Sequence, residues 1–257
     1  MPEQQFFSVK LISKTMISRD IMELHFEKPV GFSFIPGQFV QFQVPQPEGV
    51  LLRSYSVSSH PAEVDLEFCA KMLPEGKASA LFSRLEAGES VQITAAKGVF
   101  GCRADHSPKK VFIATGAGIA PIMSMMKEQL EIATMPAVVL VTADARGTST
   151  VQPQSFQSVS TNTNTLLFGI RTPEDSFWKE RLEQLAGEYP QFSFHVTSSR
   201  PAEPWNGLRG RVTAHLPQYI IADAEYYICG SVEMVKDVRT LLMNNGVNTK
   251  NIHFEIF

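Results

Sequence analysis

The chain has 257 residues, of which 44% are hydrophobic and 19% are charged, and its formal net charge is −3. This composition is typical of a folded globular protein with one or two domains, and it excludes an intrinsically disordered chain. The weak negative charge argues against nucleic-acid binding, and no apolar run approaches the roughly 18–20 residues that cross a bilayer.

The first hundred residues are predicted to form a small β-domain. Six segments are rich in β-branched or aromatic residues that alternate with polar ones, which indicates strands. Turn residues separate these segments at the spacing of a barrel or a sandwich. A helical pattern interrupts them at 76–89, where Gly88 marks the end of the helix. The predicted strands are 6–14, 21–29, 37–45, 51–59, 64–72 and 89–97.

From about residue 106 onward, apolar strands alternate with helices. This alternation is typical of a doubly wound parallel sheet. We therefore predict a first domain at 1–105 and a second, α/β domain at 106–257, with the boundary in "RADHSP" (103–108). The predicted strands of the second domain are 109–116, 137–143, 165–171, 192–199, 224–230 and 251–257, and its predicted helices are 117–133, 173–188 and 231–246.

Residues 144–165 do not fit this alternation. The stretch is rich in Ser, Thr, Gln and Asn and has almost no apolar residues. Such a composition is typical of a polar surface loop, so we interpret it as an insertion in the second domain. The alternative to a surface loop without a function is a segment that contacts a partner protein.

The cysteines and the N-terminus bear on metals and on location. Cys69, Cys102 and Cys229 lie far apart and form no CxxC pair. An iron–sulfur cluster of the plant ferredoxin type needs four thiolates, and the histidines show no zinc-binding spacing, so we expect no bound metal. The first residues lack a basic segment followed by an apolar one, so we expect a cytoplasmic protein rather than a secreted one.

Eight short motifs occur in order along the chain. Together they resemble the plant-type ferredoxin–NADP reductase superfamily over almost the whole length. This resemblance implies an antiparallel Greek-key β-barrel that binds FAD, followed by an α/β domain that binds NAD(P). The motifs are "PGQFV" (36–40), "RSYS" (53–56), "EGKAS" (75–79), "TGAGIAP" (115–121), "GIRTPED" (169–175), "SSRP" (198–201), "CGSVEMV" (229–235) and "FEIF" (254–257).

The resemblance gives "RSYS" a role in holding the flavin. In the family, the Arg of this motif meets the pyrophosphate, the Tyr packs on the ring system and the Ser hydroxyl reaches N5, which implies these roles for Arg53, Tyr55 and Ser56. A guanidinium suits a phosphate, an aromatic ring suits a planar ring, and a hydroxyl can donate a hydrogen bond. A barrel strand with an exposed Arg is the alternative interpretation.

Two further segments resemble flavin-binding elements of the family. The backbone of Cys69, Ala70 and Lys71 resembles the second wall of the flavin site. "EGKAS" precedes a short helix, whose free N–H groups and dipole can bind a phosphate. For Ser79, a capping serine without a ligand is the alternative. The residues that the resemblance assigns to the flavin pyrophosphate here are Gly76, Lys77, Ala78 and Ser79.

"TGAGIAP" joins a predicted strand to a predicted helix. Gly116 and Gly118 permit a tight turn and the close approach of a pyrophosphate to the start of the helix. Thr115 and Pro121 belong to the same motif. Because the motif lies in the second domain, we expect it to bind the nicotinamide dinucleotide rather than the flavin.

Four residues are predicted to act in hydride transfer. Cys229 and Gly230 end a strand where α/β sheets bind ligands, and the resemblance places Cys229 beside the nicotinamide C4. Glu255 and Phe257 match an acid and a terminal aromatic ring that lie against the flavin in the family, with Phe where plant enzymes carry Tyr. The resemblance thus implies catalytic roles for Ser56, Cys229, Glu255 and Phe257. A Cys that packs as a small apolar group, and a core strand that ends in Phe, are the alternatives.

The choice between NADPH and NADH depends on the 2′-phosphate of NADPH. Arg171, Ser199, Arg200 and Arg211 resemble positions that select NADP in bacterial ferredoxin reductases. Two charged hydrogen bonds to this phosphate would discriminate by about 10²- to 10⁴-fold. The segment from "SRP" to "WNGLRGRV" also resembles NADH-using oxygenase reductases. The sequence therefore favours NADPH slightly and leaves NADH open.

The resemblance implies an FAD enzyme that transfers hydride from NAD(P)H to flavin N5. Because the cysteines of a fused cluster are missing, we expect an external electron acceptor, namely a ferredoxin, a flavodoxin or an oxygenase component. A free-flavin or ferric reductase that uses flavin as a substrate is one alternative. A non-catalytic electron-transfer or regulatory subunit is the other.

Overall fold

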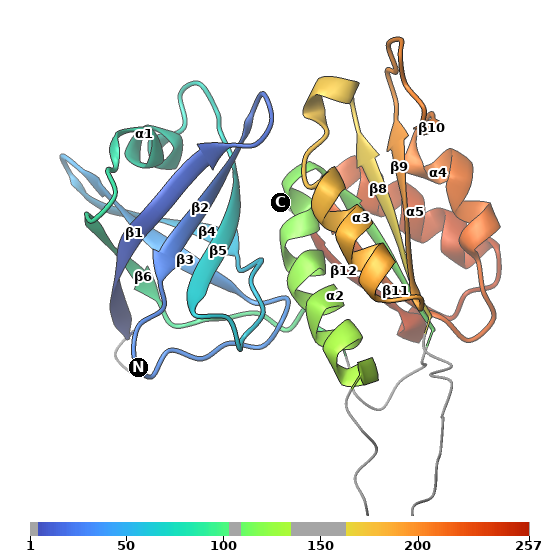
Figure 1. Ribbon diagram of the computed structural model, residues 1–257, viewed down its shortest axis with the longest axis horizontal. Coiled ribbons are helices and arrows are strands. Elements are labelled where there is room, and N and C mark those ends of the chain that lie inside the picture. The colour runs from blue at the N-terminus through green and yellow to red at the C-terminus, as the bar shows by residue number, and fades with distance from the viewer. Residues whose placement is uncertain (1–4, 103–108, 135–162, 257) are drawn as a thin grey trace, which may run out of the picture.

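The computed structural model describes residues 5–102, 109–134 and 163–256. It has two domains that lie side by side, a β-barrel and a parallel sheet covered by helices (Figure 1). The predicted two-part architecture is therefore confirmed. The predicted boundary at 103–108 lies outside the described residues. Among the residues that the structure describes, no helix is long and apolar enough to cross a membrane.

The first domain is a six-stranded antiparallel sheet that curls into a barrel. Its strand order is β4-β3-β6-β1-β2-β5, and the two edges meet where Val57 bridges Phe68 and the Ser58 N–H donates to the Glu67 carbonyl over 2.8 Å. The elements are β1 (Phe6–Met16), β2 (Ile21–Glu27), β3 (Phe39–Gln46), β4 (Gly49–Ser56), β5 (Asp65–Lys71), α1 (Lys77–Arg84) and β6 (Ser90–Thr94).

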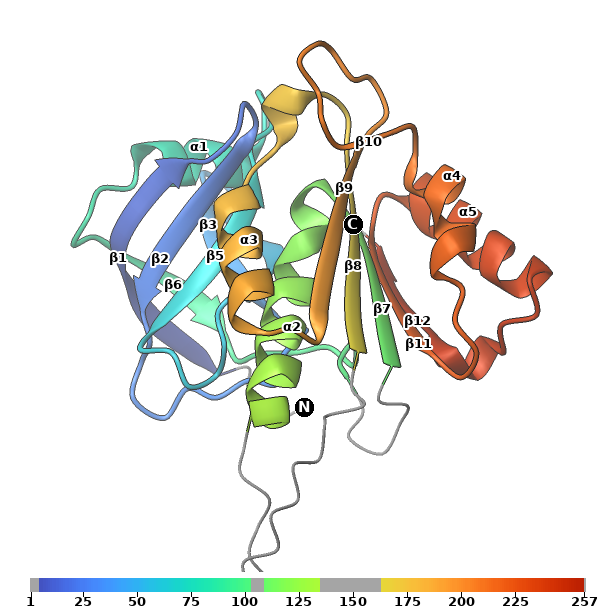
Figure 2. The same cartoon turned by 45° about the vertical axis from the view of Figure 1, so that its right-hand side comes forward.

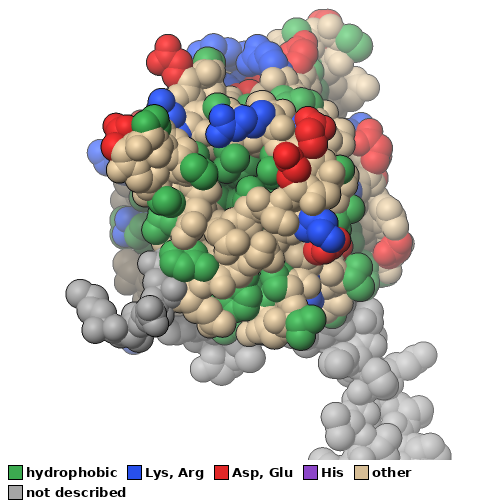
Figure 3. Space-filling view, turned by 90° about the vertical axis from the view of Figure 1, so that its left-hand side faces the viewer, with side chains coloured by type: hydrophobic (Ala, Val, Ile, Leu, Met, Phe, Trp, Pro, Cys, Tyr) green, Lys and Arg blue, Asp and Glu red, His purple; other side chains and the backbone are tan. Residues whose placement is uncertain are grey.

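A cluster of aromatic rings fills the barrel and fixes α1 and β4. The fully buried ring of Phe42 lies 5.1 Å from Phe68, 5.2 Å from Phe82 and 5.6 Å from Tyr55, in edge-on contacts. Each such ring contributes about 1.5–3 kcal/mol by burial, so the core ties Tyr55 to the helix. Seen from the side away from the second domain, the barrel surface mixes apolar with charged side chains (Figure 3).

Among the residues that the structure describes, the second domain forms a six-stranded parallel sheet with the order β10-β9-β8-β7-β11-β12. Helices α2 and α3 cover the face toward the barrel, and α4 and α5 cover the other face (Figure 2). The elements are β7 (Lys109–Thr115), η1 (Gly116–Gly118), α2 (Ile119–Thr134), β8 (Thr163–Ile170), η2 (Pro173–Asp175), α3 (Lys179–Glu188), β9 (Phe192–Ser198), β10 (Leu208–Arg209), α4 (Val212–His215), β11 (Glu225–Gly230), α5 (Val232–Asn244) and β12 (Ile252–Ile256).

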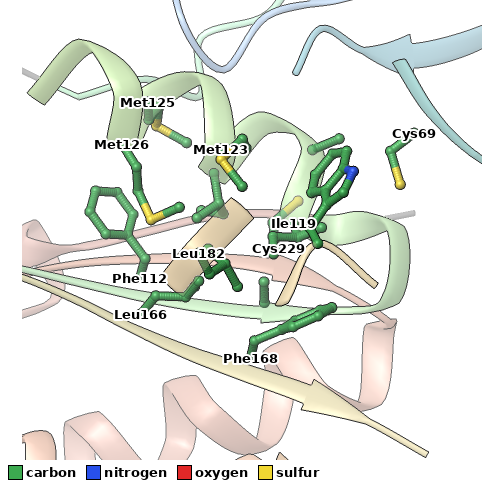
Figure 4. Close-up of a cluster of buried hydrophobic side chains, with 14 of the residues drawn as sticks. Cys69, Phe112, Ile119, Met123, Met125, Met126, Leu166, Phe168, Leu182 and Cys229 are labelled. Carbon is green, nitrogen blue, oxygen red and sulfur yellow. The ribbon is translucent and has the colours of Figure 1, made fainter. Parts of the chain in front are cut away.

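Successive side chains of β7 point alternately to the two faces of this sheet. Phe112 and Ala114 belong to the cluster under α2 and α3, whereas Val111 and Ile113 belong to the cluster under α5. Figure 4 shows the first cluster, in which side chains of the sheet meet Met123 and its neighbours on α2. The same cluster includes residues of the barrel, so the two domains share one apolar contact.

The structure corrects two of the predicted elements. Residues 163–165 belong to β8 and not to a polar loop, because pairing with β7 and β9 outweighs the low strand propensity of these side chains. The predicted helix at 173–188 is divided, since Trp178 has a left-handed backbone (φ 58°) and separates η2 from α3. The predicted strand 137–143 and the rest of the insertion, 144–162, lie outside the described residues.

Candidate functional site

A cleft of about 900 Å³ lies between the two domains. It opens at the carboxyl ends of β7, β8 and β11, the edge at which open α/β sheets bind ligands. Both domains contribute to its walls. The residues predicted from the sequence that line it are Tyr55, Ser56, Cys69, Lys71, Thr115, Gly116, Arg171, Ser199, Arg200, Arg211 and Glu255.

The barrel side of the cleft is formed by the ends of β4 and β5. The Tyr55 ring packs edge-on against Phe42 and Phe82, at 5.6 and 5.2 Å. Burial raises the pKa of Tyr55 to about 12, although the charge of Arg53 opposes the shift, so the phenol stays neutral. Ser56 is half-buried at the end of the same strand. This wall therefore offers both an aromatic ring and a hydroxyl to the cleft.

Other predicted flavin residues lie outside the walls of the cleft. The Arg53 guanidinium is exposed and donates to the Leu52 carbonyl over 3.0 Å. The Ser79 hydroxyl accepts the N–H of Leu73 over 2.9 Å, which fixes the loop that leads to α1. Leu73 itself lines the cleft, so this bond links the helix to the wall. Predicted residues that do not line the cleft are Arg53, Ala70, Gly76, Lys77, Ala78, Ser79, Gly118, Pro121, Cys229 and Gly230.

The turn between β7 and α2 packs directly on the end of β11. A β-carbon on Gly118 would lie 2.3 Å from the Cys229 carbonyl oxygen, so this position requires glycine. Cys229 is fully buried beneath the turn (Figure 4). Burial, reinforced by the charge of Glu255, raises the pKa of Cys229 well above its usual range, so the side chain stays a thiol. The sequence thus brings the start of α2 to the floor of the cleft.

Glu255 faces the cleft from β12, beside Cys229 in the strand register. Burial raises the pKa of Glu255. Its Oε2 atom is buried and has no hydrogen-bond partner among the described residues. A buried acceptor of this kind calls for a ligand or a proton, so Glu255 is suited to hold one. Phe257, predicted to lie against the flavin, lies outside the described residues.

Polar residues converge where β8 and β9 end. The Ser199 N–H donates to the Ile170 carbonyl over 3.0 Å, and the Arg200 N–H donates to the Arg171 carbonyl over 2.7 Å. These backbone bonds hold the two strand ends together while the side chains of Ser199, Arg200 and Arg211 stay exposed at the cleft. This corner therefore presents two guanidinium groups and a hydroxyl, a set that can bind a phosphate.

Two family models match the two domains. The model of the oxidoreductase FAD-binding domain matches residues 8–101, and that of the oxidoreductase NAD-binding domain matches residues 112–240. The chain belongs to the ferredoxin–NADP reductase superfamily. The predicted NAD(P)H-dependent flavoprotein oxidoreductase is thus confirmed at the level of the family.

Individual relatives agree with this family. The chain is 28% identical to ferredoxin–NADP reductase B of Sorangium cellulosum, over 99% of each chain. It is 28% identical to the anthranilate 1,2-dioxygenase electron transfer component of Acinetobacter baylyi, over 97% of this chain and 65% of the relative. It therefore spans about two thirds of the length of that relative. In fold it is similar to a ferredoxin NADP⁺ reductase of Neisseria gonorrhoeae with bound FAD and NADP (TM-score 0.79, 24% identity, 99% of each chain).

An ion-pair network at the domain contact of this oxidoreductase is not predictable from the sequence. Arg181 on α3 donates to both oxygens of the buried Glu67 (2.9 and 3.1 Å) and to Glu23 over 3.1 Å. Trp178 Nε1 also donates to Glu23, over 2.6 Å. Ligand atoms of Glu23, His25 and Glu67 lie within 4.8 Å of one another, but Arg181 already supplies a cation to both glutamates.

This network shifts two pKa values in opposite directions. Burial would raise the pKa of Glu23, but hydrogen bonds from His25 and Trp178 and the charge of Arg181 outweigh it and lower the pKa to about 2. The hydrogen bond to Glu23, opposed by burial and supported by Asp65, raises the pKa of His25 to about 9. The domain contact therefore holds a charged histidine at neutral pH.

Proposed function

We propose that this protein is an FAD-containing reductase in which NAD(P)H delivers hydride to flavin N5. The observation that carries the proposal is the cleft of about 900 Å³ that both domains line. Such a volume lies in the range of cofactor pockets. Most of its walls come from the two regions that match the FAD-binding and NAD-binding domain models, and Glu255 and Ile256 of β12 complete them.

The residues of the cleft are suited to the proposed cofactors. Tyr55 offers a neutral aromatic ring, and Ser56 offers a hydroxyl to the same cleft. Glu255 offers a buried carboxylate oxygen without a partner among the described residues. When bound, FAD would accept hydride from the reduced nicotinamide and supply electrons to an acceptor. We assign the pyrophosphate of FAD to the N-terminus of α1 and to the exposed guanidinium of Arg53.

The protein's own groups would position the rings and keep water away. The packing of Gly118 against β11 sets the floor on which a nicotinamide would lie. The neutral Cys229 thiol packs beneath this floor without lining the cleft, and Glu255 can hold a proton close by because burial raises its pKa. Ser56 can donate a hydrogen bond to an acceptor that gains charge during transfer. Reaction would depend mainly on bringing donor and acceptor to about 3–3.5 Å.

We favour NADPH over NADH as the donor. The support is the corner of Ser199, Arg200 and Arg211, where two exposed arginines can meet a phosphate. A phosphomonoester carries about −1.5 to −2 charge, so it would use both of them. NADH is the alternative, because oxygenase reductase components are also among the relatives.

An external electron carrier is the proposed acceptor. Relatives named ferredoxin–NADP reductase and dioxygenase electron transfer component support a ferredoxin, a flavodoxin or an oxygenase component as the partner. The cytoplasm remains the predicted location, supported by the three free thiols Cys69, Cys102 and Cys229. The second candidate function is that of a free-flavin or ferric reductase. Such an enzyme uses flavin as a substrate and, unlike the proposed reductase, does not retain FAD.

The deciding measurement is the visible absorption spectrum of the purified protein, before and after denaturation. We expect flavin bands and the release of about one FAD per chain, the stoichiometry of one cleft. Anaerobic addition of NADPH should then bleach these bands, and NADH should do so more slowly. A colourless protein that does not retain added FAD would contradict the prosthetic-group assignment and favour a free-flavin reductase.

A further inference from the structure

Two ion pairs join the domains at one rim of the cleft, and each domain contributes one arginine and one aspartate to them. The barrel contributes Arg19 and Asp20 from the turn between β1 and β2, and the second domain contributes Arg171 and Asp175 from the segment after β8. Arg171 Nη2 lies 3.0 Å from Asp20 Oδ2, and Arg19 Nη2 lies 3.2 Å from Asp175 Oδ1. Arg171 Nε also lies 3.6 Å from Asp175 Oδ2.

Asp20 faces cations from both domains. Its Oδ2 atom lies 3.0 Å from Arg171 Nη2 and 3.7 Å from Nζ of Lys71 at the end of β5. All three residues line the cleft. The Asp20 carbonyl accepts the N–H of Met72 over 2.7 Å, which fixes the turn against β5. The carboxylate therefore stands where an anionic oxygen is bound by two cations, as a phosphate oxygen would be.

Arg171 can leave Asp20 without disturbing the fold. Its carbonyl accepts hydrogen bonds from the Arg200 N–H (2.7 Å) and the Ser198 hydroxyl (2.9 Å), so the backbone is held at the end of β8. Its side chain is 53% exposed. An ion pair this exposed contributes about 0–1 kcal/mol, so a change of partner costs little.

The aspartates cannot follow Arg171 if it moves. Asp175 is held by the capping box of η2, in which its Oδ2 accepts the Thr172 N–H over 3.1 Å. Asp20 is held by its turn and retains Lys71 as a partner. A guanidinium that turns toward a ligand in the cleft would therefore exchange one anion for another while both aspartates stay in place.

We propose that Asp20 competes with a phosphate of the nicotinamide nucleotide for Arg171, and so lowers the affinity of the cleft for that nucleotide. Arg171 leaves Asp20 when the phosphate arrives and returns to it when the nucleotide leaves. The inference rests on the proposed function, because it needs a nicotinamide nucleotide in the cleft. Asp20 is thus an affinity-setting residue that itself makes no bond to the ligand.

The test is the variant Asp20→Asn, which keeps the size of the side chain and removes its charge. Equilibrium dissociation constants of NADP⁺ and NAD⁺ would be measured by calorimetry on the FAD-loaded protein. We expect at least one nucleotide to bind about two- to fivefold more tightly, the equivalent of an exposed ion pair. Glu27→Gln is the matched control, because it removes the same charge from an exposed pair with Lys10 elsewhere on the barrel.

A double-mutant cycle separates competition for Arg171 from a general change in charge. In an Arg171→Gln background, Asp20→Asn should leave the dissociation constants unchanged, because the contested guanidinium is absent. An equal gain in that background, or no gain in the parent protein, would overturn the competition. A parent protein that binds neither nucleotide would overturn the proposed function and this proposal with it, so the two failures are distinguishable.

Discussion

Gly230 approaches Thr115 so closely that a β-carbon at Gly230 would lie 2.2 Å from the Thr115 hydroxyl oxygen. The backbone of Gly230 also has φ of +156°, a conformation that side chains disfavour. The contact joins the end of β11 to the end of β7, the two strands between which the order of the sheet reverses. Glycine is therefore needed at the point where the sheet is expected to bind a nucleotide.

Gly230→Ala should weaken nucleotide binding and destabilise the second domain. The added methyl group collides with Thr115, so we expect a loss of about 1–3 kcal/mol in the free energy of unfolding. Chemical denaturation and a nucleotide titration would measure both effects. Gly187→Ala is the matched control: it lies in α3 with open space around it, so stability should rise by about 0.5–1 kcal/mol. A Gly230→Ala protein as stable as the parent would contradict the packing argument.

Ser56→Ala should slow the reduction of the flavin and leave FAD content unchanged. We expect the rate to fall by about 10²-fold, because a hydrogen bond that strengthens in the transition state is lost. Anaerobic stopped-flow mixing with NADPH would measure the rate. Ser90→Ala, an exposed serine on β6, is the control and should keep the parent rate. A rate within error of the parent would remove Ser56 from the reaction.

Local patterns were sufficient to predict most of the fold. The alternation in the first hundred residues gave six strands, and the six strands of the barrel are observed. "TGAGIAP" was predicted to turn from a strand into a helix, and it does so between β7 and α2. These features depend on neighbouring residues, which the sequence displays directly. Many of the predicted site residues also line one cleft, because strand ends gather at one edge of the sheet.

Ionic contacts between the domains were not predictable in this way. Asp20 and Arg19 occur in a dipeptide that indicates only a turn, and their partners lie 151 and 156 residues further along the chain. Trp178 likewise has a left-handed backbone and donates a hydrogen bond to Glu23 in the other domain, and no local sequence signal indicates either feature. Pairing between distant segments depends on the folded structure, and local sequence patterns do not indicate it.

The variants Arg200→Gln and Arg211→Gln should test the choice of nucleotide. If these arginines bind the 2′-phosphate, each substitution should raise KM for NADPH by about 10- to 100-fold and leave KM for NADH unchanged. Arg209→Gln is the matched control, since this neighbouring arginine does not line the cleft and pairs with Glu203 over 2.6 Å. Equal losses with both nucleotides would instead assign these arginines to a phosphate that NADH and NADPH share.

The stability of the protein should fall at alkaline pH through His25. Its pKa is raised from 6.5 to about 9 in the folded protein, so its stabilising contribution is complete below pH 6.5 and is lost as the pH rises through 9. Above that pH the neutral ring no longer offsets Glu23, Asp65 and Glu67 at the domain contact. Because the side chain is 24% exposed, solvent screening limits the loss to about 1–2 kcal/mol.

Urea denaturation at pH 6.5, 8 and 9.5 would measure this loss, with His25→Gln as the test variant. The parent protein should lose stability over this interval, and the variant should be less stable at pH 6.5 and approach the parent at pH 9.5. His215→Gln, in α4 on the far side of the sheet from the barrel, is the control and should follow the parent. Curves for the parent and His25→Gln that run parallel across the interval would show that His25 does not hold its proton through Glu23 and Asp65.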